Sequence, residues 1–322
     1  MSGPQPGAPG LFRFGLEGRR APALFVTGWL ASLIGAGALF VGLLGGGLTG
    51  GLLVVGGLAI LSLGLALLAG AQTVERQASG AAYGGPSPVI VFAAALTTTL
   101  VAETLAAIVF GLLGFAPWRP LGDLVVVAVQ AAAFIGVVAA FVVGPGAISW
   151  TEMGLTLSVR RALGALGRGA LYAPPVVVLT ALLAAVIVPA FGVSPPSPLP
   201  PTGTATGLAL HLLAGAVIAP VAEEVLFRGV AVTAWARTAG PRAAIVWSAL
   251  LFAAAHVLPL SGETFSQGAA LAVVAALGRM PVALALGWLY LRSGTLWASI
   301  GLHAAFNAAL IILAESAGQF AG

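Results

Sequence analysis

The sequence has no cysteine and no lysine, and it contains few charged residues of any kind. Without cysteine there can be no disulfide and no thiolate metal site, and the redox chemistry of the compartment leaves no trace in the sequence. Only 7% of the residues are Asp, Glu, Lys or Arg, against roughly 25% in soluble globular domains. A surface so poor in charge would not stay dissolved in water, so the sequence excludes a soluble globular protein.

Apolar residues take the place of charge and make up 60% of the chain. Runs of about 18 or more apolar residues recur from end to end, and each is long enough to cross a bilayer as a helix. We therefore predict an all-α fold, a polytopic transmembrane helix bundle with about 8–9 spanning helices that is surrounded by lipid. The apolar runs are residues 23–44, 51–72, 89–117, 124–147, 171–194, 207–236, 242–258, 269–291 and 295–314.

The apolar pattern is broken at two places in the second half of the chain. Gly278, Arg279 and Pro281 interrupt the eighth run, which indicates a short helix followed by a spanning one. The uncharged, proline-rich loop 195–206 separates five runs from the last four, and such connectors are stiff. We therefore divide the chain into a disordered cytoplasmic tail, a group of N-terminal transmembrane helices and a C-terminal membrane core. Their limits are 1–22, 23–194 and 207–314.

The positive charge of the chain is spread over its loops. All thirteen basic residues are Arg, and they are scattered, so the net charge of +4 does not indicate a nucleic-acid partner. If the spans alternate in direction, most loop arginines fall on the side of the N-terminus, and such a bias marks the cytoplasmic side. We therefore predict a multi-pass protein of the cell membrane with a cytoplasmic N-terminus.

Polar and ionisable side chains inside the apolar runs cluster in the sixth, seventh and ninth runs. Each costs ~2.5–3.5 kcal/mol to insert into a membrane, so it needs a partner or a function. Counting 1.5 Å per residue, the acidic and histidine groups lie ~16–21 Å from the arginine at the end of their run. These similar depths allow them to meet inside the bilayer. The residues of this polar set are Glu223, Glu224 and Arg228 in the sixth run, His256 in the seventh, and His303 and Asn307 in the ninth.

Helical spacing separates the two neighbouring carboxylates. Glu224 and Arg228 are four residues apart and share a helix face, so they can form an ion pair. Glu223 points ~100° away from Glu224, which leaves its carboxylate free for another task. The same spacing places two further pairs on shared faces, Phe252 with His256 and His303 with Asn307.

A carboxylate, two imidazoles and an amide can hydrolyse a peptide bond without a serine or cysteine nucleophile. The carboxylate takes a proton from water with the help of a histidine, and amide and imidazole N–H groups stabilise the oxyanion. Alternatively, Glu223, His256 and His303 hold Zn²⁺ and leave its fourth position to water, as in a metalloprotease. The H-E-x-x-H signature is absent, so the zinc hypothesis depends on the three side chains converging in space.

Three segments carry a resemblance to a known family: EEVLFRG at 223–229, FAAAH at 252–256 and HAAFN at 303–307. In this order they resemble the E-E-x-x-x-R, F-x-x-x-H and H-x-x-x-N motifs of the CPBP family, which comprises CAAX proteases and bacteriocin-processing enzymes and is also called the ABI family. The likeness covers roughly residues 207–314 and is absent from the first five runs. One departure is the tract 279–281, where the family is usually smoothly apolar.

The resemblance implies an intramembrane endopeptidase, similar to the CAAX prenyl endopeptidases and dependent on either a glutamate or a metal. Its partner would be a peptide or protein substrate at the membrane, cut in a membrane-associated segment or next to a C-terminal motif. Phe252, Glu224 and Arg228 would then be supporting residues. By matching positions in the motifs, the resemblance implies that Glu223 and His256 activate water. It also implies that His303 and Asn307 stabilise the oxyanion.

Other hypotheses stay open for the same residues. The protein could be a non-catalytic member of this fold, for bacteriocin immunity or scaffolding, or the polar groups could only brace the helices. It could also be a proton-coupled transporter, which would favour an internal repeat that the sequence does not show.

Overall fold

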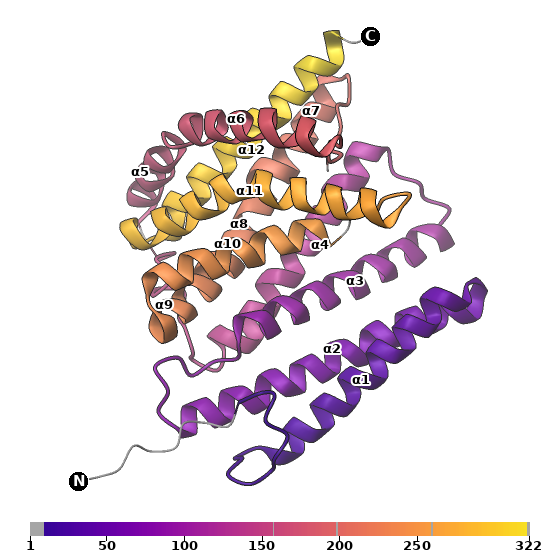
Figure 1. Ribbon diagram of the computed structural model, residues 1–322, viewed down its shortest axis with the longest axis vertical. Coiled ribbons are helices and arrows are strands. Elements are labelled where there is room, and N and C mark those ends of the chain that lie inside the picture. Colours follow the sequence, from indigo (N-terminus) through magenta and orange to yellow (C-terminus); the bar gives the residue numbers. More distant parts are fainter. Residues whose placement is uncertain (1–9, 157, 198, 259, 321–322) are drawn as a thin grey trace. The chain divides into compact units, whose positions relative to one another are not determined.

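The computed structural model describes residues 10–156, 158–197, 199–258 and 260–320, and every regular element in these ranges is helical (Figure 1). Most elements are α-helices, and three short segments, η1 to η3, have π-helical hydrogen bonding. In chain order they are α1 (Pro22–Gly45), α2 (Gly47–Ala78), α3 (Pro88–Leu112), α4 (Arg119–Val138), η1 (Ala139–Val143), α5 (Val159–Ala170), α6 (Ala173–Phe191), α7 (Ala205–Leu212), η2 (Leu213–Ile218), α8 (Ala219–Glu224), η3 (Val225–Val232), α9 (Thr233–Ala239), α10 (Pro241–Val257), α11 (Phe265–Ser293) and α12 (Leu296–Phe320).

Eight helical stretches of the described chain are long and apolar enough to cross a membrane, which confirms the predicted polytopic helical bundle. The seventh predicted run forms α10, whose 17 residues make it shorter than the others. The protein is thus a multi-pass membrane protein, while the particular membrane and the side of the N-terminus stay predictions. The eight stretches are Pro22–Gly45, Gly47–Ala78, Pro88–Leu112, Arg119–Val143, Val159–Phe191, Ala205–Ala239, Phe265–Ser293 and Leu296–Gly318.

The predicted break in the eighth run is wrong. α11 is one continuous helix with Pro281 inside it. The ring of Pro281 removes one backbone hydrogen bond, to the carbonyl of Leu277, and neighbouring helices make such a loss tolerable in membranes. Here α11 packs against α10, α6 and α12, and Val282 and Leu286 beyond the proline are buried. Packing on several sides therefore keeps the helix continuous where the local sequence favours an interruption.

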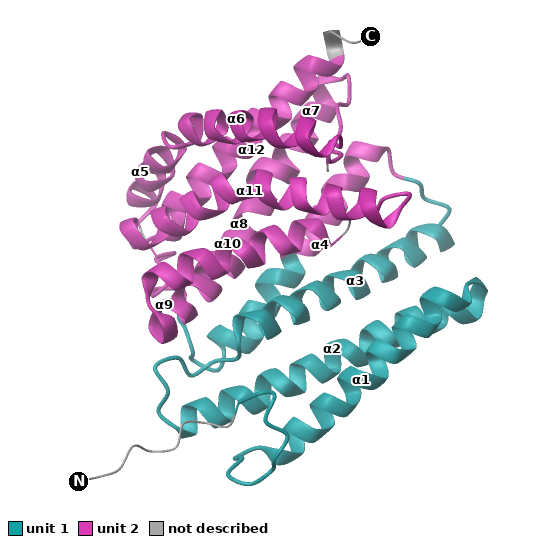
Figure 2. Cartoon of the chain, viewed as in Figure 1, with its two compact units in different colours: residues 1–116, 132–149 teal, residues 117–131, 150–322 magenta. Residues whose placement is uncertain are grey.

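The chain forms two compact units, which are shown in different colours in Figure 2. Unit 1 comprises residues 1–116 and 132–149, and unit 2 comprises residues 117–131 and 150–322. These units reflect packing alone, so the predicted functional division at the proline-rich loop stays a prediction. All residues of the three motifs lie in unit 2.

In unit 1, glycines bring α1 and α2 together. A Cβ on Gly35 would lie 2.7 Å from the carbonyl oxygen of Gly57, and one on Gly42 would lie 2.8 Å from that of Gly50. Small residues of this kind let two membrane helices approach until their backbones touch. The glycines recur every seven residues, close to two helical turns, so each set forms one stripe. The stripes are Gly28, Gly35 and Gly42 in α1, and Gly50, Gly57 and Gly64 in α2.

A buried ion pair ties the segment before α1 to the end of α2. Arg19 Nη1 donates to both carboxylate oxygens of Glu75, at 2.9 and 3.0 Å. Both side chains are almost fully buried. Residues 1–9 of the predicted tail lie outside the described residues.

In unit 2, α12 is held by close contact with α5. A Cβ on Gly169 would collide with the carbonyl of Ala298, and one on Gly301 would collide with the carbonyl of Leu166. Since α12 carries His303 two residues after Gly301, this contact fixes the depth and rotation of that histidine. The adjoining core is formed by Ala173, Val282, Leu286, Leu289, Ala298, Leu302 and Phe306 from α6, α11 and α12.

Candidate active site

The sixth predicted run is a single helical stretch in which two π-helical segments flank α8. η2 precedes α8 and η3 follows it. π-helical turns are rare, and they occur frequently at functional sites because they change the direction of the side chains and carbonyls around them. Glu223 and Glu224 are the last two residues of α8, so both acidic residues lie where the helix changes its winding. The sequence analysis, which assumed regular α-helices, missed this feature.

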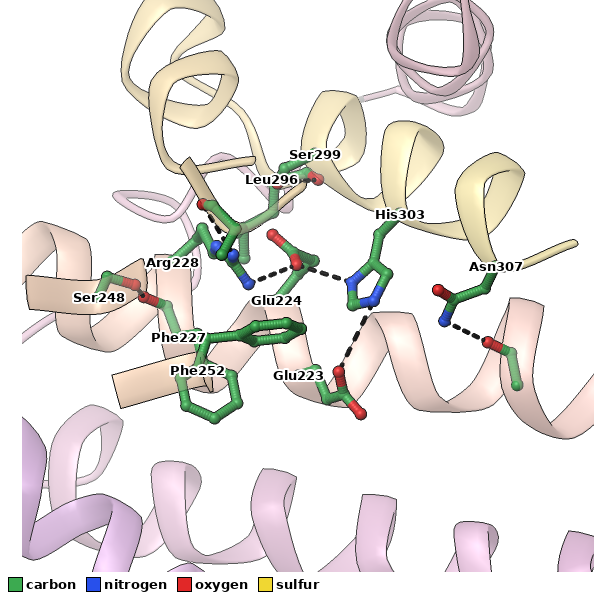
Figure 3. Close-up of polar contacts among 12 residues, drawn as sticks. Glu223, Glu224, Phe227, Arg228, Ser248, Phe252, Leu296, Ser299, His303 and Asn307 are labelled. Atoms are coloured by element: carbon green, nitrogen blue, oxygen red, sulfur yellow. Dashed lines mark hydrogen bonds and ion pairs between the residues drawn. The ribbon is translucent and has the colours of Figure 1, made fainter. Parts of the chain in front are cut away.

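Glu224 is the centre of a buried polar network (Figure 3). Its Oε1 accepts hydrogen bonds from Arg228 Nη1 at 2.8 Å and from His303 Nδ1 at 2.9 Å. Arg228 Nη2 also donates to the backbone carbonyl of Ala283 in α11, at 3.2 Å. Glu224 and Arg228 are both 0% exposed, so each charge depends on the other for compensation. The predicted ion pair is thus observed, and its network joins α8, η3, α11 and α12.

Glu223 points away from this network and toward two histidines. Its Oε2 lies 3.7 Å from His303 Nε2 and 4.0 Å from His256 Nε2. The three side chains come from α8, α12 and α10, so the predicted convergence of three helices is observed. The separations are too long for direct hydrogen bonds and suit a water molecule that bridges the groups. His256 is the most exposed of the three, with 28% of its side chain accessible, so the cluster is open on its side.

Backbone and carboxylate partners orient both imidazole rings. His256 Nδ1 lies 2.8 Å from the backbone carbonyl of Phe252. A carbonyl only accepts, so Nδ1 carries the hydrogen and the lone pair of Nε2 faces Glu223. In the same way, Nδ1 of His303 donates to Glu224 and turns Nε2 toward Glu223. Both reactive nitrogens therefore face the same carboxylate.

Phe252 forms the apolar wall of the cluster. Its ring centroid lies 4.4 Å from that of His256 and 5.7 Å from that of His303. The guanidinium carbon of Arg228 lies 4.7 Å from the ring centre, within the range of a cation–π contact. The predicted contact with His256 is observed, and the structure adds the contacts with His303 and Arg228. One buried ring thus restricts the motion of three polar side chains.

Asn307 is positioned by a backbone carbonyl that the helix itself cannot satisfy. In η2 the N–H of Ala219 bonds to the carbonyl of Ala214, five residues earlier. In this register the carbonyl of Gly215 would pair with residue 220, which is proline and has no N–H. Asn307 Nδ2 donates to that carbonyl at 2.8 Å. One N–H of the amide is used in this way, and the second remains for a ligand.

The donor types of the cluster suit zinc, since histidines whose second nitrogen is held by a carboxylate or carbonyl are typical metal ligands. Their arrangement does not complete such a site. Across the described residues, no group of three or more His, Cys, Asp or Glu side chains is placed to hold a metal ion. The zinc site of Glu223, His256 and His303 therefore stays a prediction for metal analysis of the purified protein.

Two further ionisable groups were missed as partners by the sequence analysis. His211, the third histidine, is buried away from the cluster, where its Nε2 lies 3.0 Å from Asp123 Oδ2 of α4. Arg279 of α11 is close enough to Glu223 and His256 for their charges to interact. Its position inside an apolar run was the available signal, which the sequence analysis interpreted as a helix break.

Together, the fold and the site define a class: multi-pass helical membrane proteins with carboxylate, imidazole and amide groups gathered among their spans. Comparison with known families makes the assignment specific. Residues 205–309 match the model of the family described as type II CAAX prenyl endopeptidase Rce1-like. This part of the chain is therefore similar to that family, in agreement with the resemblance of its motifs. No curated protein and no solved structure matches the chain.

Proposed function

We propose that this protein is an intramembrane endopeptidase that hydrolyses a peptide bond of a membrane-associated or C-terminal-motif substrate with water activated by Glu223 and His256. The observation that carries the proposal is the position of Glu223 Oε2, which lies 3.7 and 4.0 Å from the Nε2 atoms of His303 and His256. The family description names prenyl endopeptidases, and for this chain we propose only a peptide substrate at the membrane.

The first step is the attack of water on the scissile carbonyl carbon. A water bridging Glu223 and His256 gives one proton to the Glu223 carboxylate as its oxygen bonds to the carbon. His256 Nε2 accepts a hydrogen bond from the same water. This bond orients the water so that a lone pair of its oxygen points at the carbonyl carbon. Its ring is held for this task by Phe252, through both the Nδ1 hydrogen bond and the ring contact.

The second step needs donors for the carbonyl oxygen, which becomes an oxyanion. The free N–H of Asn307 is one donor. His303 is the other when its ring enters the reaction doubly protonated, with the proton on Nε2 taken from solvent before the substrate binds, because Glu224 stabilises the charged ring through Nδ1. Collapse of the intermediate breaks the C–N bond, and Glu223 returns its proton to the leaving amine, so the products are a carboxylic acid and an amine.

The experiment compares Glu223→Gln with the wild type in liposomes that contain a defined pool of acylated synthetic peptides. Glutamine keeps the shape of the side chain and cannot take the proton, so we expect cleavage to fall by about 10²–10⁴-fold. Products are identified by mass spectrometry. Glu263→Gln serves as the matched control, since Glu263 is exposed in the described loop before α11.

Equal cleavage by wild type and Glu223→Gln would refute the assignment of the base. If the wild type cleaves no peptide in any pool tested, the result contradicts the proposed endopeptidase activity. Incubation with a chelator, followed by zinc analysis, tests the metal hypothesis in the same preparation. Lost activity that returns with zinc would support a metal at the cluster.

A further inference from the structure

Arg279 lies inside a membrane helix near the proposed site and makes no ion pair with any described carboxylate. Its hydrogen bond in the described structure runs from Nη1 to the carbonyl of Ala275, one turn earlier in α11, at 3.0 Å. The side chain is partly buried. A guanidinium has five N–H donors, so most of its hydrogen-bonding capacity remains for a ligand.

The position of Arg279 on α11 directs it toward the catalytic helices. Ala275, Arg279 and Ala283 are spaced by four residues, so they lie in one stripe on the helix. Ala275 and Ala283 are buried, and the carbonyl of Ala283 receives the hydrogen bond from Arg228. Arg279 is therefore one turn away from the network of Glu224, on the same face of α11.

The contact between α10 and α11 shows independently how far along the two helices Arg279 and His256 lie. α10 and α11 run side by side (Figure 1), and a Cβ on Gly287 would lie 3.5 Å from a side-chain carbon of Ile245. The two helices are joined by a short loop and run in opposite directions. Counting 1.5 Å per residue from this contact, Arg279 lies ~12 Å along α11 and His256 ~16 Å along α10 in the same direction. The two side chains thus differ by about one turn in depth.

An arginine among membrane helices pairs with another charged group or with backbone carbonyls, and the carbonyl of Ala275 leaves the charge of Arg279 without a counterion. Oε1 of Glu224 already accepts hydrogen bonds from Arg228 and His303, and Arg279 forms no ion pair with this carboxylate. Glu223 is close enough for its charge to act on Arg279, yet the two form no ion pair. Arg279 is therefore a cation beside the proposed water-activating groups that forms no ion pair with a carboxylate of the described residues.

We propose that Arg279 binds a carboxylate of the substrate peptide close to the scissile bond. This inference rests on the proposed function. The planar guanidinium matches a carboxylate with two parallel hydrogen bonds, and the proximity to Glu223 places that carboxylate within a few residues of the bond that is cut. Both the C-terminal carboxylate of a peptide and an acidic side chain provide this chemistry.

The experiment measures peptide binding to the full-length protein in lipid nanodiscs, in the Glu223→Gln background so that no peptide is consumed. The probes are one pool of acylated peptides in three forms: free C-terminal acid, C-terminal amide, and amide with an added Asp near the C-terminus. Retained peptides are quantified by mass spectrometry. The variants are Arg279→Gln, Arg279→Lys and the control Arg242→Gln, whose arginine is exposed at the start of α10.

We expect the parent protein to retain at least one carboxylate form ~10–100-fold better than the plain amide. Arg279→Gln should lose this preference while it binds the amide as before, Arg279→Lys should keep part of it, and Arg242→Gln should keep all of it. If the parent protein prefers the C-terminal acid, Arg279 binds the C-terminal carboxylate of the peptide. If it prefers the form with the added Asp, Arg279 binds a side-chain carboxylate. An unchanged preference in Arg279→Gln, or none in the parent protein, would overturn the proposal. Because binding is measured without turnover, these results are independent of whether the wild type cleaves the pool.

Discussion

Glycines bring helices into close backbone contact in both units, and unit 2 adds polar contacts between its helices. In unit 1, α1 and α2 meet along glycine stripes, where the absence of side chains lets the backbones touch. In unit 2, α8, α10 and α12 meet at Glu223, Glu224, His256 and His303. Lipid offers no hydrophobic force between helices, so either close packing or polar contact can join them. Polar groups cost more to insert, and for this reason we place the proposed catalytic site where they are concentrated, in unit 2.

The largest effect should come from breaking the polar network of unit 2. Arg228→Met removes the cation that compensates Glu224, and both are fully buried. The uncompensated carboxylate should destabilise the protein by about 3–5 kcal/mol. Thermal or denaturant-induced unfolding in detergent measures the change.

Arg237→Met is the matched control, because Arg237 and Glu152 form an ion pair whose side chains are 31% and 47% exposed. Such pairs contribute about 0–1 kcal/mol. Equal losses of stability in the two variants would show that burial of the Arg228 pair is unimportant.

A smaller loss is expected from filling the glycine stripe of unit 1. The new methyl group of Gly35→Ala meets the backbone of α2, and overpacking of this kind costs about 1–3 kcal/mol. Gly37→Ala is the control, since nothing lies within 4 Å of its Cβ position. Cleavage per folded molecule should stay unchanged in both variants because α1 carries no residue of the site. A stability as high in Gly35→Ala as in Gly37→Ala would disprove the close backbone contact.

The smallest effect concerns the position of Asn307. Pro220→Ala supplies an N–H that can bond to the Gly215 carbonyl and so compete with the Asn307 amide. We expect the rate of cleavage to fall about tenfold, equivalent to ~1.4 kcal/mol, with little change in stability. Pro241→Ala, at the first turn of α10 where proline frees no carbonyl, should keep the wild-type rate. If Asn307→Ala slows the reaction and Pro220→Ala does not, the proline has no positioning role.

Local regularities made much of the site predictable from the sequence. Glu224 and Arg228 pair because residues four apart share a helix face, and this holds even though Arg228 lies in a π-helical segment. The free direction of Glu223 follows from the same geometry. The convergence of His256 and His303 on Glu223 followed from their similar depths in three separate runs.

Features that depend on distant partners could not be predicted in this way. The break expected near Pro281 did not form, because packing by several helices outweighs the local effect of one proline. The hydrogen bond between His303 and Glu224 and the pairing of His211 with Asp123 join residues 79 and 88 positions apart. The glycine stripes were not predicted either, since their seven-residue period only becomes meaningful when two helices face each other.

Two adjacent glutamates have opposite roles in the proposed mechanism. The decisive measurement is the rate of peptide cleavage and the free energy of unfolding of Glu223→Gln and Glu224→Gln, in one membrane preparation. We expect Glu223→Gln to be inactive and as stable as the wild type, and Glu224→Gln to unfold more readily because it loses the partner of Arg228. Wild-type cleavage by a stable Glu223→Gln protein would contradict the central claim.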